Sequence, residues 1–385
     1  MASGQRAILI DARVNGIPRA HGLARSVMKL AEHMGASQGS LALRILVNPS
    51  RTQLFPLAGL SGRAELLGTD IRPGAVHRCR ELGKLIWDAG AAVINVPYPL
   101  FAPLVCPCPM VVTIHDCIIE STASHAGGWH RQLGLKLATK AMLRRSAAVT
   151  APTRATLDEI RRHYPAAPNP TLISNGIDIR PFTAVTDGTV AAARKRYGLP
   201  ERFILTVGAH RPHKNHGVLL RALAAMPAAV SLVIVGHSDP TFRDRLPARI
   251  SRLGLESRVR LVPEVAEESL PAVYRAASVF AFPSVVEGYG LPVLEAMAAG
   301  VPVVASAIPS LAEVCGSAAT LVPPDDAASW ASAMLTVLDD CGAATGMIAA
   351  GRAVAAAATW EAGSRALGDL LSSVAYATSS GPAVR

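Results

Sequence analysis

Short apolar runs alternate with amphipathic segments along nearly the whole chain, and this alternation limits the fold more than any other feature. A strand that is followed by a helix and then by another strand is typical of the crossover connections of a parallel sheet. The amphipathic segments include residues 19–34 and 131–145. The runs expected to be strands in the first half are 6–10, 41–47, 91–96, 110–114 and 147–150.

A second series of the same kind begins at Phe203. Between the two series, residues 176–200 contain several glycines and prolines and show little periodicity, which is typical of a linker. The 385 residues are enough for two or three domains. The strands expected in the second series are 203–207, 230–235, 258–262, 278–282, 301–305 and 318–322. We therefore expect two α/β domains over residues 1–180 and 200–358, joined by a linker over 181–199, with a last helix over 360–378 that packs back on the first domain.

Composition excludes several classes of protein. Half of the residues are hydrophobic, so the chain can bury a core, and only 4% are aromatic, which argues against a nucleic-acid binder that stacks bases. The six cysteines form no C-x-x-C pair and are expected to be reduced thiols. We find no secretory leader and expect no membrane span, so the chain is predicted to be cytoplasmic, with peripheral contact to the cell membrane as an open alternative.

The basic excess belongs to the first half. Residues 1–190 contain 21 basic and 12 acidic residues, a net charge of +9, whereas the rest of the chain has +1 of the total +10. Lys136, Lys140 and Arg144 recur at helical spacing in one stripe. The stripe is open to two interpretations, a solvated helix face or a surface attracted to anionic lipid.

The most informative stretch runs from Glu287 to Ser306. It follows an expected strand, and Pro292 suits the first turn of a helix, so Gly288 and Gly290 lie in a strand-to-helix loop. Glycines let the backbone approach a ligand, and the amides of a helix N-terminus favour phosphate. Glu295 follows about one turn inside the helix. Because carboxylates do not bind phosphate, Glu287 and Glu295 are expected to accept hydrogen bonds from sugar hydroxyls on either side of a phosphate.

A second cluster lies at the next strand-to-helix junction of the same domain. Arg211 and Lys214 follow the strand 203–207, at the edge of the sheet where open α/β sheets bind ligands. Asn215 is a candidate N-cap of the next helix. Together with the amides of 288–291, the two cations would hold a diphosphate.

In the first half, titratable groups follow three expected strands. His115 and Asp116 end the strand 110–114, Asn15 and Gly16 follow the first strand, and Tyr98 follows the third. Because the carboxyl ends of parallel strands share one edge, we expect these groups to face one crevice. Histidines 210, 213 and 216 suggest a metal site, but their spacing is expected to scatter them, so no metal is expected.

These stretches together resemble the retaining glycosyltransferases of family 4. The matching stretches are TVGAHRPHKNHGVLLRAL, ASVFAFPSVVEGYGLPVLEAMAAGVPVVAS, IPSLAEVCGSAATLVPPDD, VVTIHD and LISNGID. The resemblance implies the GT-B fold, two facing Rossmann-like domains of which the first binds the acceptor and the second binds a nucleotide diphospho-sugar donor. It also implies retention by front-face attack without a metal, with a phosphate oxygen of the leaving group as base.

The resemblance also assigns roles to residues. Arg211 and Lys214 would hold the donor diphosphate, Glu287 the hydroxyls of the donor sugar, Glu295 the ribose, and His115 would lie beside the reaction centre. The residues expected to contact the donor besides these are Gly16, Asp116, Gly208, Gly288, Tyr289, Gly290 and Leu291.

The predicted activity is transfer of a hexosyl group from GDP-mannose or a UDP-sugar. The acceptor would be a saccharide, a lipid-linked molecule or a natural product, and no nucleic acid is expected as a partner. Two alternatives remain at this point, a sugar-nucleotide epimerase of similar fold and a non-catalytic module that binds nucleotide sugars.

Overall fold

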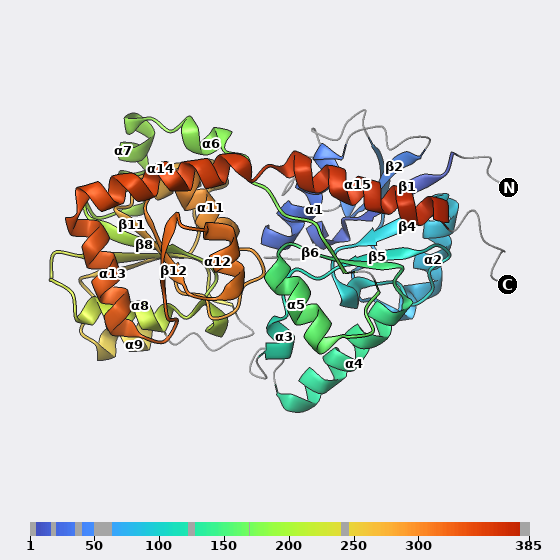
Figure 1. Ribbon diagram of the computed structural model, residues 1–385, viewed down its shortest axis with the longest axis horizontal. Coiled ribbons are helices and arrows are strands. Elements are labelled where there is room, and N and C mark those ends of the chain that lie inside the picture. The colour runs from blue at the N-terminus through green and yellow to red at the C-terminus, as the bar shows by residue number, and fades with distance from the viewer. Residues whose placement is uncertain are drawn as a thin grey trace. The chain divides into compact units, whose positions relative to one another are not determined.

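The computed structural model describes residues 5–16, 21–34, 41–49, 64–121, 128–168, 170–239 and 246–377. The chain divides into two compact units. Unit 1 consists of residues 1–176 and 360–385, and unit 2 consists of residues 177–359 (Figure 1). Each unit is an α/β layer structure in which helices cover a parallel sheet.

Unit 1 contains, within its described residues, a sheet of seven parallel strands in the order β3-β2-β1-β4-β5-β6-β7. The strands are β1 (Ala7–Asp11), β2 (Ala42–Val47), β3 (Glu65–Gly68), β4 (Ala91–Val96), β5 (Met110–Thr113), β6 (Ala148–Ala151) and β7 (Pro170–Leu172). The α-helices are α1 (His21–His33), α2 (Cys79–Asp88), α3 (Ile118–Ser121), α4 (Trp129–Arg145), α5 (Arg154–His163) and α15 (Trp360–Ala377). Short 3-10 helices are η1 (Arg13–Gly16), η4 (Val76–Arg78) and η5 (Pro99–Phe101).

Unit 2 contains a sheet of six parallel strands among its described residues, in the order β10-β9-β8-β11-β12-β13. The strands are β8 (Phe203–Val207), β9 (Ser231–Val235), β10 (Val259–Val262), β11 (Val279–Phe282), β12 (Val303–Ser306) and β13 (Ala319–Val322). The α-helices are α6 (Arg180–Thr183), α7 (Asp187–Tyr197), α8 (His216–Ala224), α9 (Leu246–Arg252), α10 (Leu270–Ala276), α11 (Leu291–Ala298), α12 (Pro309–Cys315), α13 (Ala327–Asp339) and α14 (Cys341–Ala357). Two 3-10 helices are η7 (Pro212–Lys214) and η8 (Glu267–Ser269).

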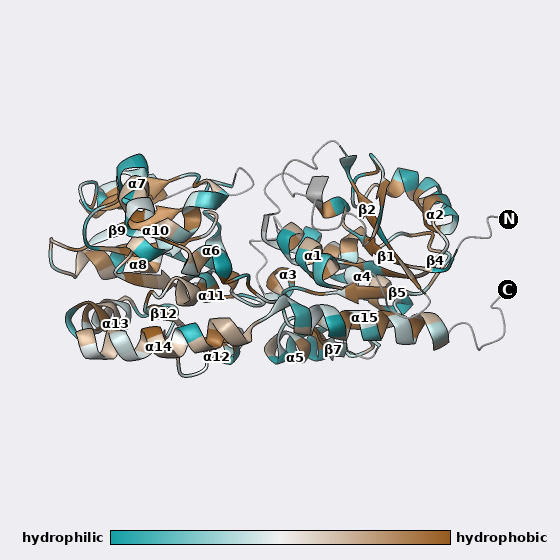
Figure 2. Cartoon of the chain, turned by 90° about the horizontal axis from the view of Figure 1, so that it is seen from above, coloured by the Kyte–Doolittle hydropathy of each residue, from teal (hydrophilic) through white to brown (hydrophobic). Residues whose placement is uncertain are grey.

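Both sheets are buried on two faces, which explains their uninterrupted apolar strands. In β8, Phe203 and Leu205 pack into one hydrophobic cluster and Ile204 packs into another on the opposite face. This alternation follows from the pleat, since successive side chains point to opposite faces. In Figure 2 the strands of both units are mostly brown, whereas helices such as α5 and α7 carry hydrophilic residues.

The strand order in each unit confirms the predicted fold class of two Rossmann-like domains. In both sheets the first strand in sequence lies at the centre, and the order reverses between it and the fourth strand, which is the arrangement of a doubly wound fold. The C-terminal helix α15 packs against α1 and β4 of unit 1. Arg6 supports it by donating from Nη2 to the carbonyl oxygen of Ala375.

The prediction of a linker over 181–199 is wrong, because this segment folds as part of unit 2. Helix α7 begins with a capping box in which Thr186 and Thr189 satisfy each other's backbone amides, and it ends at Gly198 in the left-handed conformation. Ala193 and Leu199 are buried in the core of the unit. The residues that begin and end this short helix, Thr186 and Gly198, are also typical of loops, which is why the sequence pattern favoured a linker.

Two edge strands were not expected from the sequence. In β3 the side chains are mainly exposed, and β7 has three half-buried residues, so neither has an apolar run. Edge strands pair on one side only and need less burial. Their register is set by the neighbouring strands β2 and β6.

One helical stretch bears on the expectation that the chain has no membrane span. Among the described residues, one helical stretch, Cys341–Ala377, reaches the length and composition that a span needs, and only 11% of its most apolar window is buried. Ala358 and Thr359 interrupt it, so it consists of α14 and α15. Helix α14 packs against α11 and α13 in unit 2, whereas α15 packs in unit 1. Length and composition by themselves indicate a span only weakly.

Candidate active site

Most of the predicted donor residues lie on or just after two loops that leave neighbouring strands of unit 2, whereas Gly16 and Asp116 belong to unit 1. Strand β8 leads through Gly208 into η7, and β11 leads through Gly288 and Gly290 into α11. Strands β8 and β11 pair directly. They flank the point at which the strand order reverses, where open α/β sheets bind ligands at the carboxyl edge. The two loops are joined by a hydrogen bond from the amide of Val285 to the carbonyl oxygen of His213.

Lys214 and Glu287 meet at this junction although 73 positions separate them. Lys214 Nζ lies 2.6 Å from Glu287 Oε2, and the two side chains are only 16% and 18% exposed. The ammonium also lies 4.9 Å from the centre of the Phe282 ring. An ammonium has three N–H donors, so two remain for other acceptors after the bond to Glu287.

Arg211 is held differently. Its Nε donates to Oδ2 of Asp239 at 2.7 Å, and its side chain is 40% exposed while that of Asp239 is 10% exposed. Asp239 follows β9, the next strand of the sheet. This bond fixes the orientation of the guanidinium. It uses Nε and leaves the terminal nitrogens Nη1 and Nη2 outside the bond.

The backbone is closely packed around the same two loops. A side chain at Gly236 would place its Cβ 2.0 Å from the carbonyl oxygen of Gly208, so Gly236 must be glycine for the β8 and β9 loops to approach. Gly290, with φ of +92°, is the N-cap of α11, and a Cβ there would meet Leu311 at 2.6 Å. The Ser310 hydroxyl fixes the loop further by donating to the carbonyl oxygen of Glu287.

The amides at the start of α11 are fewer than a helix N-terminus usually offers. Pro292 has no N–H, and the amide of Val293 donates to the carbonyl oxygen of Gly290. Leu291 begins the helix, and Tyr289 is half-buried beside it, where burial and the nearby Glu313 carboxylate raise the pKa of its phenol to about 12.

Glu295 lies inside α11 and is 4% exposed. The hydroxyl of Tyr274, which is fully buried on α10, donates to Glu295 Oε2 at 2.7 Å. This bond occupies one carboxylate oxygen and fixes the other. Sequence reasoning missed Tyr274, Asp239 and Ser310, because each lies outside the motif that it supports.

The structure corrects two further expectations about the histidine-rich loop. Asn215 does occupy the N-cap position of α8, but its φ is 51° and its side chain makes no capping bond, donating instead to the carbonyl oxygen of Pro324. His210 and His216 are not scattered, since their rings lie 5.7 Å apart in an edge-on contact. Among the described residues, no group of three or more His, Cys, Asp and Glu side chains could hold a metal ion.

In unit 1, His115 follows β5 and is buried. Burial lowers the pKa of its imidazole to about 4, against a smaller opposite effect of a hydrogen bond to the Pro97 backbone, so the ring is neutral at neutral pH. Its Nε2 is buried and has no hydrogen-bond partner within the part of the chain that the structure describes. The side chains that enclose a small cavity beside it include Ile10, Val27, Leu30, Asn95 and Thr113.

The other predicted groups of unit 1 have local structural contacts. Asp116 accepts the amide of Ile118 at the start of α3. Tyr98 packs on Phe101. Burial raises the pKa of its phenol, and the carboxylates of Asp116 and Glu120 add to this effect. Gly16 ends η1, directly after β1.

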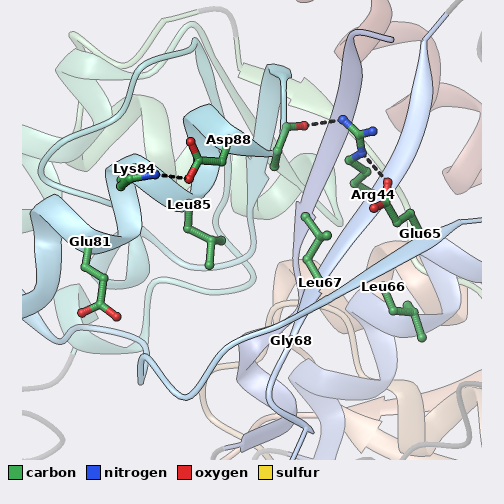
Figure 3. Close-up of a pocket in the computed structure, with 10 residues that line it drawn as sticks. Arg44, Glu65, Leu66, Leu67, Gly68, Glu81, Lys84, Leu85 and Asp88 are labelled. Carbon is green, nitrogen blue, oxygen red and sulfur yellow. Dashed lines mark hydrogen bonds and ion pairs between the residues drawn. The ribbon is translucent and has the colours of Figure 1, made fainter. Parts of the chain in front are cut away.

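An open pocket of unit 1 lies away from these residues, between β2, β3 and α2 (Figure 3). Four of its charged side chains are paired with one another, Lys84 with Asp88 and Arg44 with Glu65, and the fifth, Glu81, is paired with Arg78. The whole of β3 lines this pocket, at the edge of the sheet away from β5, which leads to His115. We do not assign it to the candidate site.

Comparison with known proteins identifies the family. The family model "Glycosyl transferases group 1" matches residues 201–340, and the model "Glycosyltransferase Family 4" matches residues 21–180. The chain belongs to glycosyltransferase family 4. The region 201–340 carries the Lys214–Glu287 pair, and the region 21–180 carries His115.

Individual relatives agree with this family. A D-inositol 3-phosphate glycosyltransferase of Xylanimonas cellulosilytica is 32% identical over 273 residues, which are 68% of this chain and 66% of that protein. This glycosyltransferase family 4 chain thus spans just under two thirds of that relative, and only 39% of the one from Mycolicibacterium smegmatis.

Solved structures support the GT-B fold. A sucrose-phosphate synthase from Thermosynechococcus elongatus is 25% identical, with a TM-score of 0.78 over 97% of this chain and 100% of that chain. HepE of Anabaena, solved with UDP and glucose, has a TM-score of 0.75 at 20% identity, covering 96% of this chain and 100% of its own.

Proposed function

We propose that this chain is a retaining, metal-independent glycosyltransferase that moves a hexosyl group from a nucleotide diphospho-sugar to a glycan, lipid-linked or natural-product acceptor. The observation that carries the proposal is the pairing of Lys214 with Glu287 at the point where the strand order of unit 2 reverses. This pair would supply a cation for phosphate beside a carboxylate for sugar hydroxyls. We further propose that unit 2 binds the donor, that unit 1 binds the acceptor and that the protein is cytoplasmic.

The contacts support a division of work between the charged residues. Lys214 keeps two N–H donors after its bond to Glu287, and Arg211 keeps the nitrogens that Asp239 does not fix. These donors would hold the diphosphate and stabilise the negative charge that grows on it as it leaves. Glu287 would accept hydrogen bonds from the donor sugar, and Glu295, fixed by Tyr274, from the ribose.

The proposed reaction needs no metal and no protein nucleophile. The bond between the anomeric carbon and the diphosphate oxygen breaks, the acceptor oxygen bonds to the same carbon, and the acceptor proton passes to an oxygen of the departing diphosphate. His115 would orient a substrate hydroxyl as a neutral imidazole, because its pKa of about 4 keeps it uncharged at neutral pH. Family membership favours this reaction over a sugar-nucleotide epimerase and over a non-catalytic binding module.

Substrate identity is open to a direct experiment. HepE was solved with UDP, and the relatives are named D-inositol 3-phosphate glycosyltransferases. The first donors to test are therefore UDP-sugars, beside GDP- and dTDP-sugars, and the first acceptor to test is D-inositol 3-phosphate. Calorimetry would find the base that binds, and product analysis would find the sugar that is transferred. Donor incubated alone should yield neither an epimer nor rapid hydrolysis, and transfer should continue in EDTA.

Two carboxylate variants test the assigned roles. Glu287→Ala should abolish transfer and leave the affinity for the nucleoside diphosphate nearly unchanged, since Lys214 is then released for the phosphates. Glu295→Ala should instead weaken nucleoside diphosphate binding. The opposite pattern, or loss of activity in EDTA with recovery on addition of magnesium or manganese, would contradict the proposal.

A further inference from the structure

Helix α4 of unit 1 exposes large apolar and basic side chains on the same side. Trp129 is 62% exposed, Leu133 is 51% exposed and Leu137 is 58% exposed, although such side chains are usually buried. The helix lies along the lower edge of unit 1 in Figure 1. Its buried residues, Thr139 and Leu143, lie on the adjacent side, next to the half-buried Lys136.

The basic stripe predicted from the sequence lies within this apolar face. At 100° per residue, the exposed apolar residues and the three cations fall within an arc of about 100° around the helix. We call this set the α4 outer face. It consists of Trp129, Leu133, Lys136, Leu137, Lys140 and Arg144.

The charge of this face is not balanced on the helix itself, because α4 contains no acidic residue. On the neighbouring α3 and α5, Glu120 accepts the Tyr164 hydroxyl and Asp158 is paired with Arg161. At its C-terminal end, Arg145 donates to the carbonyl oxygen of Leu104. Leu104 and Val105, in the loop that Arg145 contacts, are also exposed, at 42% and 46%.

We infer that the α4 outer face docks on an anionic lipid bilayer. Exposed tryptophan and leucine side chains can enter the headgroup region, and lysine and arginine beside them meet the negative surface of the bilayer. A second copy of this chain is a poorer occupant, because a symmetric contact would bring two basic rows together. A nucleic acid would use the cations but would leave both leucines in water.

The experiment is co-sedimentation of the full chain with vesicles. Vesicles of phosphatidylglycerol and phosphatidylcholine should bind the protein at about 50 mM salt and much less at about 300 mM, whereas pure phosphatidylcholine should bind little. Lys136→Glu with Lys140→Glu should reduce the partition coefficient at least about tenfold, because each cation near the surface contributes about fivefold. Trp129→Ser and Leu133→Ser with Leu137→Ser should each reduce it at least about fivefold.

Matched variants elsewhere serve as controls. Lys195→Glu with Arg221→Glu makes the same change of charge at exposed positions of unit 2, and Trp87→Ser removes a tryptophan that is 71% exposed on α2. Both should bind vesicles like the wild type. Quenching of tryptophan emission by brominated lipid gives a second measurement, and Trp129→Phe should remove most of it while the protein stays bound.

Several outcomes would overturn the inference. One is that the protein does not bind anionic vesicles at low salt, and another is that the control variants lose as much binding as the α4 variants. A third is that only the lysine variant loses binding while the apolar variants bind normally. The fourth is a dimer, seen by light scattering, that Leu133→Ser with Leu137→Ser dissociates. The vesicle measurement needs no sugar donor. Binding of nucleoside diphosphate, measured on the same variants, therefore tests the proposed function separately.

Discussion

The two units have the same strand order, but the loops at the carboxyl ends of their central strands use charge in opposite ways. After β1 in unit 1, Arg13 is bound to Asp11 in a pair whose side chains are 1% and 2% exposed, and Arg13 also donates to the carbonyl oxygen of Ile71. After β8 in unit 2, Arg211 is 40% exposed and Lys214 lies beside the glycine loop. The same topology thus buries one cation completely with its partner and leaves Arg211 partly exposed in the other unit.

The loops that follow β4 in unit 1 and β11 in unit 2 also differ in their charged residues. The loop after β4 contains Tyr98, which packs on Phe101, whereas the loop after β11 contains Glu287 and the glycine-rich start of α11. Strand order therefore does not decide where an anion binds. The side chains that leave the strands decide it, together with whether their partners are buried.

The largest expected effect would come from breaking the buried pair of unit 1. Asp11→Ala should lower the free energy of unfolding by about 3 to 5 kcal/mol, because Arg13 would remain as an unpaired buried charge. Arg211→Ala in unit 2 should cost less than about 1 kcal/mol, since that guanidinium is partly in water. Urea unfolding would measure both, with Asp88→Ala at an exposed pair as control. Equal losses for Asp11 and Arg211 would remove the contrast between the units.

Lys214→Ala should lower kcat at least about a hundredfold, equivalent to about 2.7 kcal/mol, because a charge contact to the leaving group is lost where little water can replace it. Arg211→Ala should also lower kcat about a hundredfold but less than Lys214→Ala, because Arg211 is more exposed. Lys195→Ala, at an exposed position of α7, is the control. Steady-state kinetics with the identified donor would measure kcat and KM for each variant. A change in KM alone for Lys214→Ala would contradict its role.

His115 should make the stability of unit 1 depend on pH. The pKa of this residue is lowered to about 4 from an unfolded value near 6.5, so the unfolded chain binds more protons between these values. Stability should therefore fall as the pH decreases from about 6.5 to about 4, by about 2 to 3 kcal/mol. Urea unfolding across this range should show a flatter profile for His115→Gln. A His115 resonance that titrates near pH 6.5 by NMR would refute the prediction.

Tyr274→Phe should have the smallest of these effects, raising the Kd for the nucleoside diphosphate about tenfold, because Glu295 would lose the bond that fixes one of its oxygens. Tyr197→Phe removes a comparable bond, in which the Tyr197 oxygen accepts the Ala266 amide at 3.2 Å, but away from the β8 and β11 loops. Calorimetry should find nucleotide affinity unchanged in that control. Equal effects of both substitutions on affinity would make the role of Tyr274 merely structural.

Much of the fold could be predicted from sequence alone, because buried strands and amphipathic helices have local patterns. The interior strands were found to within a few residues, as for β4 (Ala91–Val96) and β8 (Phe203–Val207). The exposed edge strand β3 and the helix α7 within the expected linker were not, since their stability comes from neighbours rather than from an apolar run. The loops after β8 and β11 were predicted because glycine, proline and charged residues directly follow these strands.

The sequence by itself determined that two α/β units exist and that Arg211, Lys214, Glu287 and Glu295 follow strands of the second. Only the tertiary structure decided that β8 and β11 are neighbours, because strand order depends on packing between elements and leaves no periodic signal. That adjacency brings Lys214 within 2.6 Å of Glu287. It was also the tertiary structure that supplied Asp239 and Tyr274 as partners, and that left Trp129 and the leucines of α4 exposed, because burial is a property of the folded chain.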